Sequence, residues 1–304
     1  MMKAIKLAAG QKVETDGVYL MSADRYHGDC TAGPGVSSSG LRTIEMKSPA
    51  HYFAGSYLNP VRAVEDDKDH LNVGRAAHTL LLGEGGFRDE YAVRPAEWSD
   101  WRTSAAKAWR DQQKFAGKTV LTPNQIDDIR GMADSLSRHP LIAAGLLQGE
   151  VERSLIWKDH TGVWLKSRPD VIPVADGVVV DLKTTTDASP DAVRRTMLDY
   201  AYPMQGALIG KAMRSVLGIK MTAFVLVFVE KTAPYAVNVA EVDAEWIGWS
   251  GRHVRRAVDT FARCIETGTW PAYEGERTVY LPEWLRKRFE QEADAGLLPQ
   301  EDAA

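Results

Sequence analysis

Clusters of cysteine and long apolar runs are both missing from this chain of 304 residues. Its two cysteines, Cys30 and Cys264, are too few for a site in which four cysteines hold a metal, and nothing supports a disulfide between them. No apolar run approaches the about 20 residues that a membrane-spanning helix needs. The first ten residues contain lysines but lack the hydrophobic segment of a convincing signal peptide. We therefore expect a soluble cytoplasmic protein with no membrane partner.

The chain also lacks an excess of positive charge, since its formal net charge is −4. This excludes a protein coated in basic residues, and binding of nucleic acid would need a local basic groove. Residues 182–220 are a candidate for such a groove, with six lysines and arginines against three aspartates and no glutamate. With 44% hydrophobic residues, the chain can bury one large core or a core with a subdomain.

Apolar periodicity divides the chain into a helical first half and a second half that begins with strands. The predicted helices of the first half span residues 40–47, 49–57, 71–82, 101–116 and 123–137. The predicted strands span 151–158, 163–173, 178–184, 221–230 and 235–242. Further helices are expected at 190–217 with a break at Pro203, from the Asp243 cap to 267, and at 284–293.

The predicted domain organisation follows from these patterns. Residues 1–36 are rich in glycine, serine, aspartate and threonine, and we expect an irregular arm with one short strand at 18–21. Residues 37–285 form one predicted domain, with a helical part at 37–149 and a sheet core with flanking helices at 150–285. Residues 286–304 are expected to hold the end of the last helix and an acidic tail.

Two carboxylates and one ammonium gather around the predicted strand at 178–184. Asp181 and Lys183 are two residues apart, so on a strand they point to the same face, roughly 6.6 Å apart. Asp170 precedes them by one predicted hairpin, whose turn is Asp176-Gly177. A two-residue turn places Asp170 opposite Lys183 on this same face. A three-residue turn, or a bulge at Pro173, would change the register.

This set of side chains suits the cleavage of phosphodiesters. Carboxylates can hold Mg²⁺, which neutralises charge on the attacking and leaving oxygens. A lysine beside the metal can orient the water or help to deprotonate it. The alternative is a surface hairpin in which Asp181 and Lys183 form an ordinary ion pair. The strand context and the preceding Pro169-Asp170 favour the catalytic interpretation.

Pro169-Asp170 followed by Asp181-Leu182-Lys183 resembles the signature of the PD-(D/E)XK nuclease superfamily, in particular the phage and prophage exonuclease VIII (RecE-like) branch. Over roughly residues 36–285, several further segments are similar to that branch: Ser39-Gly40-Leu41, Ser48-Pro49-Ala50-His51-Tyr52, 74–82, Glu152-Arg153-Ser154, Tyr202-Pro203-Met204-Gln205 and 268–273. The resemblance implies an α/β fold with a restriction-endonuclease-like core, a central mixed sheet flanked by helices, and an N-terminal helical region. With two cysteines, the chain cannot be one of the superfamily members that carry an iron–sulfur cluster.

The resemblance also implies a site around the two aspartates. It places Asp170, Asp181, the backbone carbonyl of Leu182 and a helix histidine, His78, at the metal, which would be Mg²⁺ with Mn²⁺ as a substitute. For His78, the alternative is a packed core residue, because its neighbours are apolar. The catalytic set implied by the resemblance comprises Asp170, Asp181, Lys183, Tyr202 and Gln205.

Other residues are candidates for supporting roles. Tyr202 and Gln205 share a helix face, but the pair is equally compatible with an ordinary helix start. Glu152 would orient the metal site, although one acidic residue near a strand start is unremarkable. Arg168 would clamp the phosphate or neutralise the acids, and Arg194 and Arg195 would line a DNA path or face solvent. The tryptophans at 98, 101 and 109 either cover the core, which the sequence favours, or stack on bases.

The resemblance predicts a Mg²⁺-dependent exonuclease that degrades linear duplex DNA from the 5′ end. It implies a 3′ overhang that passes to a RecT-like single-strand annealing protein, a homo-oligomeric ring, and a phage or prophage protein in a bacterial host. One alternative is a non-catalytic DNA-end-binding or structural recombination protein on the same fold. Another is a PD-(D/E)XK endonuclease, which would need a target-reading domain that the sequence does not show.

Overall fold

The computed structural model describes residues 3–62, 69–83, 87–172, 177–273, 275 and 278–298. The chain divides into two compact units, Met1–Ala272 and Tyr273–Ala304. The boundary falls earlier than the one expected at 285. The second unit contains a single described helix, α12 (Glu283–Asp294), close to the predicted 284–293. The proposed site lies entirely in the first unit.

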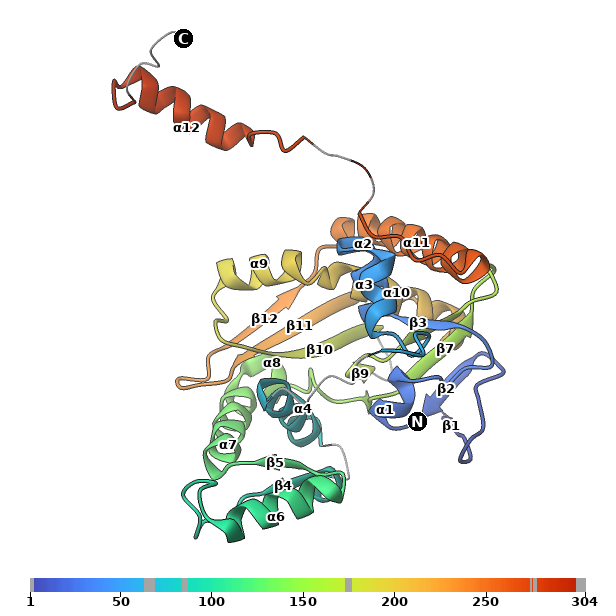
Figure 1. Cartoon of the computed structure of the whole chain (residues 1–304), viewed down its shortest axis with the longest axis vertical. Coiled ribbons are helices and arrows are strands. Elements are labelled where there is room, and N and C mark those ends of the chain that lie inside the picture. Colours follow the sequence, from blue (N-terminus) through green and yellow to red (C-terminus); the bar gives the residue numbers. More distant parts are fainter. Residues whose placement is uncertain are drawn as a thin grey trace. The chain divides into compact units, whose positions relative to one another are not determined.

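A mixed five-stranded sheet forms the centre of the first unit (Figure 1). Its strand order is β12 (Val237–Glu241), β11 (Ala223–Glu230), β10 (Val178–Thr185), β9 (Val171–Ile172) and β6 (Glu150–Val151). The β-branched run at the start of β10 suits a strand buried on both faces. β10 and β11 pair in parallel because two helices, α9 (Pro190–Asp199) and α10 (Tyr202–Ala212), connect them. The remaining pairs of this sheet are antiparallel.

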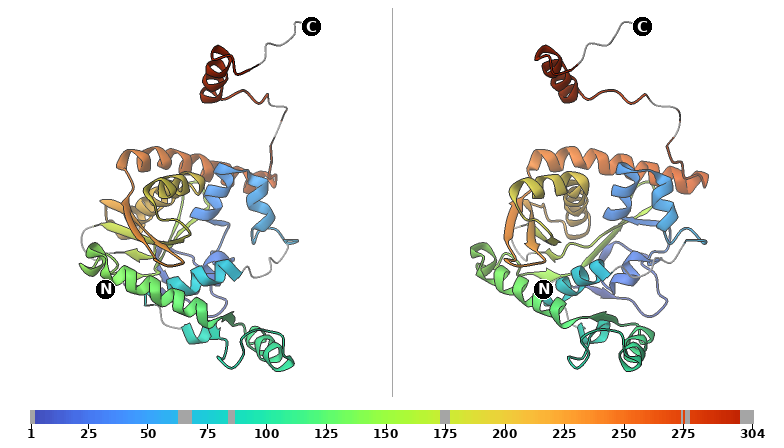
Figure 2. Two further views of the ribbon diagram at one scale, coloured as in Figure 1. Left: turned by 90° about the vertical axis from the view of Figure 1, so that its left-hand side faces the viewer. Right: turned by 60° about the vertical axis from the view of Figure 1, so that its left-hand side comes forward.

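Helices cover both faces of this sheet (Figures 1 and 2). On one face, α10 packs with α2 (Ser38–Met46) and α11 (Ala244–Thr267) over a core that includes Val179 and Phe224. On the other face, α4 (Asp69–Leu81) and α7 (Pro123–Arg138) pack over Val180 and Leu182. Successive residues of β10 therefore belong to opposite cores, so Asp181 lies on the α10 face together with Val179.

The expected irregular arm is wrong in part, because the described residues before 37 contain regular elements besides the expected strand. They form β1 (Ile5–Lys6), β2 (Gly17–Leu20), α1 (Ala23–His27) and β3 (Gly35–Ser37). These strands join β7 (Ser154–Lys158) and β8 (Trp164–Ser167) in a second sheet, ordered β1-β2-β7-β8-β3. Only the strand at 18–21 is confirmed, by β2. The other strands escape prediction because they are two or three residues long and depend on partners far along the chain.

The predicted strands at 151–158 and 163–173 each divide into two strands that belong to different sheets. The first becomes β6 and β7, and the second becomes β8 and β9. Leu155 pairs with Ser167 and Val151 pairs with Val171, so one antiparallel register continues across both breaks. The two strands thus cross from one sheet to the other at the same level, where Glu152 lies opposite Asp170.

Most other predicted elements are confirmed. Further elements of the first unit are α3 (Pro49–Gly55), α5 (Phe87–Glu90), α6 (Ser104–Phe115) and α8 (Pro140–Ala143), with a two-stranded sheet of β4 (Tyr91–Val93) and β5 (Thr119–Leu121). The predicted break at Pro203 is confirmed, because α9 and α10 are separate helices and a π-helical turn, Met213–Leu217, follows α10. Within the described ranges, no helix is both long and apolar enough to cross a membrane.

Gly206 allows α10 to approach β11 closely, and this approach positions the site residues of α10. A Cβ at Gly206 would lie 2.4 Å from Cδ1 of Phe224, so we expect Gly206→Ala to overpack this interface. Overpacking costs about 1–3 kcal/mol, which lowers the melting temperature of a unit of this size by about 2–5 °C in thermal unfolding. Gly248→Ala on α11 is the control, because its Cβ meets no atom within 4 Å and alanine favours a helix. A Gly206→Ala protein that melts at or above the wild-type temperature would contradict this account.

Candidate metal-dependent nuclease site

Strand pairing brings Asp170 and Asp181 to the same level on adjacent strands. Val171 pairs with Val180, so Asp170 lies next to Asp181 and not opposite Lys183, as the two-residue turn predicted. Asp170 lies just before β9 and outside the regular strand, so its carboxylate is not assigned to either face by alternation. Asp176 of the predicted turn and Pro173, the site of the alternative bulge, lie outside the described residues. Oδ2 of Asp170 accepts a hydrogen bond from the backbone N–H of Leu182 at 2.6 Å.

Asp181 is buried and held by two side chains. It is 1% exposed, and its Oδ1 accepts a hydrogen bond from Nε2 of Gln205 at 2.5 Å. Its Oδ2 forms an ion pair with the ammonium of Lys183. Burial without partners would strongly disfavour the ionised form, so the lysine and the amide together compensate for the desolvation of Asp181. The structure thus brings Asp181, Lys183 and Gln205 together, and their catalytic roles stay predictions.

Lys183 is an ammonium in this arrangement. Burial lowers its pKa, but the carboxylates of Asp181 and Asp170 outweigh burial, and the pKa lies above its usual value. The Nζ atom also lies 4.9 Å from the centre of the Tyr202 ring, as in a cation–π contact. Lys183 can therefore stabilise negative charge and donate hydrogen bonds at the site.

His78, Glu152 and Asp170 form a group of possible metal ligands. One donor atom of each residue lies within 4.8 Å of a donor atom of the others. His78 projects from α4, and its Nδ1 is 3.6 Å from Oδ2 of Asp170. Two carboxylates and one imidazole fit Mg²⁺ or Mn²⁺, which prefer oxygen ligands and accept a neutral histidine. In addition, Oε1 of Gln205 is buried and accepts no hydrogen bond from any residue that the structure describes.

Glu152 belongs to the group of possible metal ligands, whereas the sequence suggested only a supporting role for it. The continuous register of the paired strands places it opposite Asp170, and its backbone N–H donates to the Asp170 carbonyl oxygen at 3.0 Å. Its φ is +52°, in the left-handed region that is uncommon for a glutamate. This turn of the backbone lies at the break between β6 and β7. The sequence carries only a weak signal for it, because no local pattern reveals that the strand changes sheets.

The metal set expected from the resemblance differs from this group in one carboxylate. The close group contains Glu152 but not Asp181, whose oxygens are engaged by Gln205 and Lys183. Asp181 lies at the next strand position beside Asp170, so it borders the group. Its role as a ligand, and that of the Leu182 carbonyl, stay predictions.

The predicted arginines occupy different environments. Arg168 lies at the site: its Nε is 3.3 Å from Oε2 of Glu152, it also donates to Ser154 Oγ at 3.0 Å, and its guanidinium lies over the Tyr26 ring. It therefore neutralises and orients Glu152. Arg194 is exposed on α9 and pairs with Asp191 at 3.0 Å, while Arg195 is also exposed. No described contact joins either of these two arginines to the acidic group.

Arg42 is a second cation of the site that the sequence did not single out. Its guanidinium lies 5.5 Å from the centre of the Tyr202 ring and donates to the Tyr200 carbonyl oxygen at 2.7 Å. Burial lowers its pKa, while Tyr202 and Asp181 act in the opposite direction. The available signal was the neighbouring Ser39-Gly40-Leu41 segment. That segment predicted the helix, but it gave no indication that Arg42 on this helix reaches the site.

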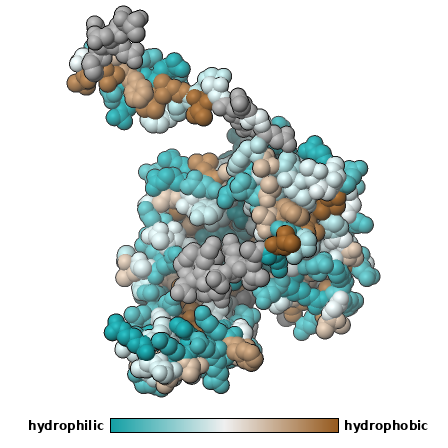
Figure 3. Space-filling view, viewed as in Figure 1, coloured by the Kyte–Doolittle hydropathy of each residue, from teal (hydrophilic) through white to brown (hydrophobic). Residues whose placement is uncertain are grey.

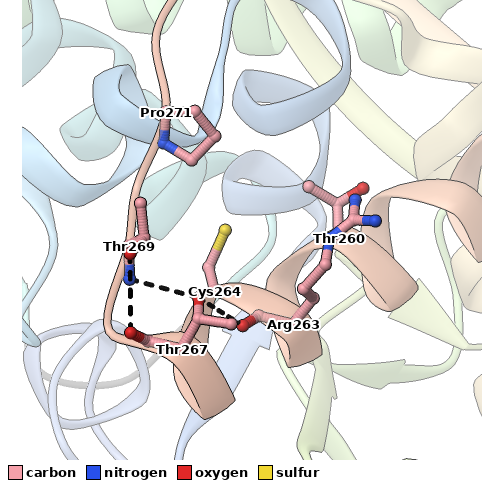
Figure 4. Close-up of a pocket in the computed structure, with 6 residues that line it drawn as sticks. All are labelled: Thr260, Arg263, Cys264, Thr267, Thr269 and Pro271. Atoms are coloured by element: carbon pink, nitrogen blue, oxygen red, sulfur yellow. Dashed lines mark hydrogen bonds between the residues drawn. The ribbon is translucent and has the colours of Figure 1, made fainter.

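A separate pocket at the end of α11 offers no comparable chemistry (Figure 4). It is lined by Thr260, Arg263, Cys264, Thr267, Thr269 and Pro271. None of these residues is acidic, and burial raises the pKa of the Cys264 thiol, which keeps it protonated. The pocket therefore has neither the carboxylates nor a thiolate for a metal site.

Comparison with known proteins agrees with this fold. The chain belongs to the family described as PDDEXK-like domain of unknown function (DUF3799), whose model matches residues 37–281. It is similar in fold to a crystal structure described as a putative exonuclease from Eubacterium rectale, with 13% identity and a TM-score of 0.56, covering 88% of this chain and 98% of that chain. A structure described as SSO0001 has 14% identity and a TM-score of 0.32, with 76% and 77% covered. None of the curated proteins matches. Family and fold support a nuclease.

We expect His78→Ala and Glu152→Gln each to weaken Mn²⁺ binding by at least about 10- to 100-fold in calorimetric titration, because each removes a donor atom. The melting temperature of His78→Ala should change little. His253→Ala is the matched control. His253 lies on α11, and its Nδ1 is 3.8 Å from the carboxylate of Glu45. Unchanged Mn²⁺ affinity together with a melting temperature several degrees lower would show that His78 is a structural residue.

Proposed function

We propose that this protein is a Mg²⁺-dependent DNA exonuclease that hydrolyses phosphodiesters of linear duplex DNA. The observation that carries the proposal is the convergence of Asp170, Asp181 and Lys183 around β10, with His78 and Glu152 beside Asp170. A simple surface ion pair does not explain this set. Asp181 is almost fully buried, and burying charges is costly unless they serve a specific arrangement.

The residues of the chain divide the work of the site between them. His78, Glu152 and Asp170, with Asp181 adjacent, would hold Mg²⁺, which when bound supplies positive charge to the scissile phosphate. Lys183 donates hydrogen bonds to the phosphate or to the attacking water and stabilises the negative charge that develops there. Gln205 holds Asp181 in place. Tyr202 supports the ammonium of Lys183 through its ring.

Several finer features of the proposal rest on the family resemblance. They are 5′-to-3′ polarity, the release of 3′ overhangs for phage-type recombination, a RecT-like annealing partner, a ring-shaped homo-oligomer and a place in the bacterial cytoplasm. Similarity in fold to the Eubacterium rectale protein is compatible with exonuclease activity. The competing functions are an endonuclease with the same chemistry and a DNA-end-binding protein that does not cleave.

One assay separates these functions. End-labelled linear duplex and closed circular duplex of the same sequence are incubated with the protein and Mg²⁺. We expect only the linear DNA to be degraded, with the 5′ label released first. Nicking of the circle would favour the endonuclease, and intact DNA of both kinds would favour the non-catalytic alternative.

Asp181→Asn should reduce cleavage to background, because it removes a carboxylate of the site while keeping the size of the side chain. The rate is measured on linear duplex under saturating Mg²⁺. Asp191→Asn on α9 is the matched control: that carboxylate is exposed and pairs only with Arg194 among the described residues. If Asp181→Asn cleaves at the wild-type rate, the proposed centre is wrong.

Lys183→Ala should slow the chemical step by about 10²–10⁴-fold while duplex affinity changes little, because one ammonium contributes little to a contact with many phosphates. Single-turnover rates give the chemical step, and binding is measured with EDTA. The substitution leaves buried Asp181 without its cation, so rates are compared below the melting temperature of the variant. Lys158→Ala, at the exposed end of β7, controls for the loss of one positive charge. Normal cleavage with much weaker binding would assign Lys183 to a simple phosphate contact.

A further inference from the structure

Three tryptophans gather between β4 and β5, on α6 and the segment before it. The rings of Trp98 and Trp109 meet edge to face with centroids 5.9 Å apart, and those of Trp101 and Trp109 are nearly parallel at 13° with centroids 6.3 Å apart. All three side chains are partly exposed. With Arg94 and Arg110 they form what we call the tryptophan–arginine cluster.

The cluster does not cover the hydrophobic core, the role that the sequence favoured for its tryptophans. In the described part of the chain, none of the three belongs to a core cluster or to the apolar residues packed against one. In contrast, two apolar residues of the flanking segments, Phe87 and Leu121, pack in the core beneath α4 and α7. Three large aromatic side chains that pack on one another outside the core and remain partly exposed favour a binding surface.

Positively charged side chains lie beside the partly exposed rings. The guanidinium groups of Arg94 and Arg110 lie 5.3 and 5.5 Å from the centre of the Trp101 ring. Nε of Arg94 is buried and has no hydrogen-bond partner among the described residues, while Arg110 contacts Asp111 at 3.4 Å. Residues 94–118 contain six lysines and arginines against three acids, although the whole chain has a net charge of −4. Around α6, at the bottom of Figure 3, the visible surface is mainly hydrophilic.

We propose that the tryptophan–arginine cluster binds single-stranded DNA, with its indole rings stacking on unpaired bases and its cations contacting phosphates. Aromatic faces beside basic side chains suit this ligand, because every base offers a flat face and every nucleotide carries a negative charge. The choice of DNA rests on the proposed function. In the sequence, the cluster follows α4, the helix that carries His78 and packs on β10.

The first test measures the affinity of the full chain for a fluorescently labelled single-stranded oligonucleotide by anisotropy, with EDTA to prevent cleavage. We expect the double variant Trp101→Ala, Trp109→Ala to bind about 5- to 100-fold more weakly. Trp249→Ala is the matched control, because Trp249 on α11 has Arg252 4.4 Å from its ring centre and is even more exposed, at 53%. The control should bind like the wild type. Equal affinities for the wild type and the double variant would overturn the proposal.

A second measurement separates stacking from charge and from folding. An abasic strand of equal length carries the phosphates without the bases, so the wild type should bind it more weakly and the double variant should bind both strands alike. Trp101→Phe with Trp109→Phe keeps aromatic faces and should recover most of the affinity. Equal binding of both strands by the wild type would leave only an electrostatic contact and overturn the stacking role. Melting temperatures show whether the alanine variant is folded.

The outcomes also distinguish this inference from the proposed nuclease function. A wild-type protein that binds the oligonucleotide through the cluster but cleaves no DNA would contradict the nuclease and leave the inference standing. Normal cleavage with no effect of the tryptophan substitutions on affinity would overturn the inference alone. If the substitutions instead change the oligomeric state in sedimentation and leave DNA affinity unchanged, the cluster is an interface between copies of the chain, and the inference is wrong.

Discussion

The paired strands that cross from one sheet to the other form the constraint on which the site depends. β6 and β7 run against β9 and β8 in one register, and both strands change sheets at the level of Glu152 and Asp170. The break frees these two side chains from regular strand positions. The hydrogen bond from the Leu182 N–H then holds the Asp170 carboxylate against β10. Without this junction, the acids would be distributed along two regular strands and would not converge with His78.

The electrostatic balance of the site follows from this geometry. Asp181 and Lys183 on β10 neutralise each other, and Gln205 on α10 satisfies the other oxygen of Asp181. On the other side of Asp170, Arg168 faces Glu152, and the His78 imidazole lies 3.6 Å from the Asp170 carboxylate. The carboxylates are thus divided between a half that is compensated by lysine and a half that is suited to a divalent cation. This division explains how several acids can lie close together in a site that is largely buried.

The aromatic residues show a similar division. Tyr52, Phe261 and Trp270 pack on one another against the main core, whereas the tryptophans near α6 pack with arginines outside it. Stability alone favours burial of indole rings, so rings that remain partly exposed beside cations are better explained by a ligand than by packing.

The sequence by itself determined the order of the main elements, the α/β class and the local pairs within single elements. Asp181 and Lys183 share a strand face and Tyr202 and Gln205 share a helix face, because the periods of strand and helix require it. Only the tertiary structure decided which acids meet. Asp170 lies beside Asp181 because of the register between β9 and β10. Glu152 lies beside Asp170 because the paired strands change sheets at this point. The approach of Arg42 depends on how α2 packs against α10. Each of these is a pairing between distant segments, and local periodicity carries no information about such pairings.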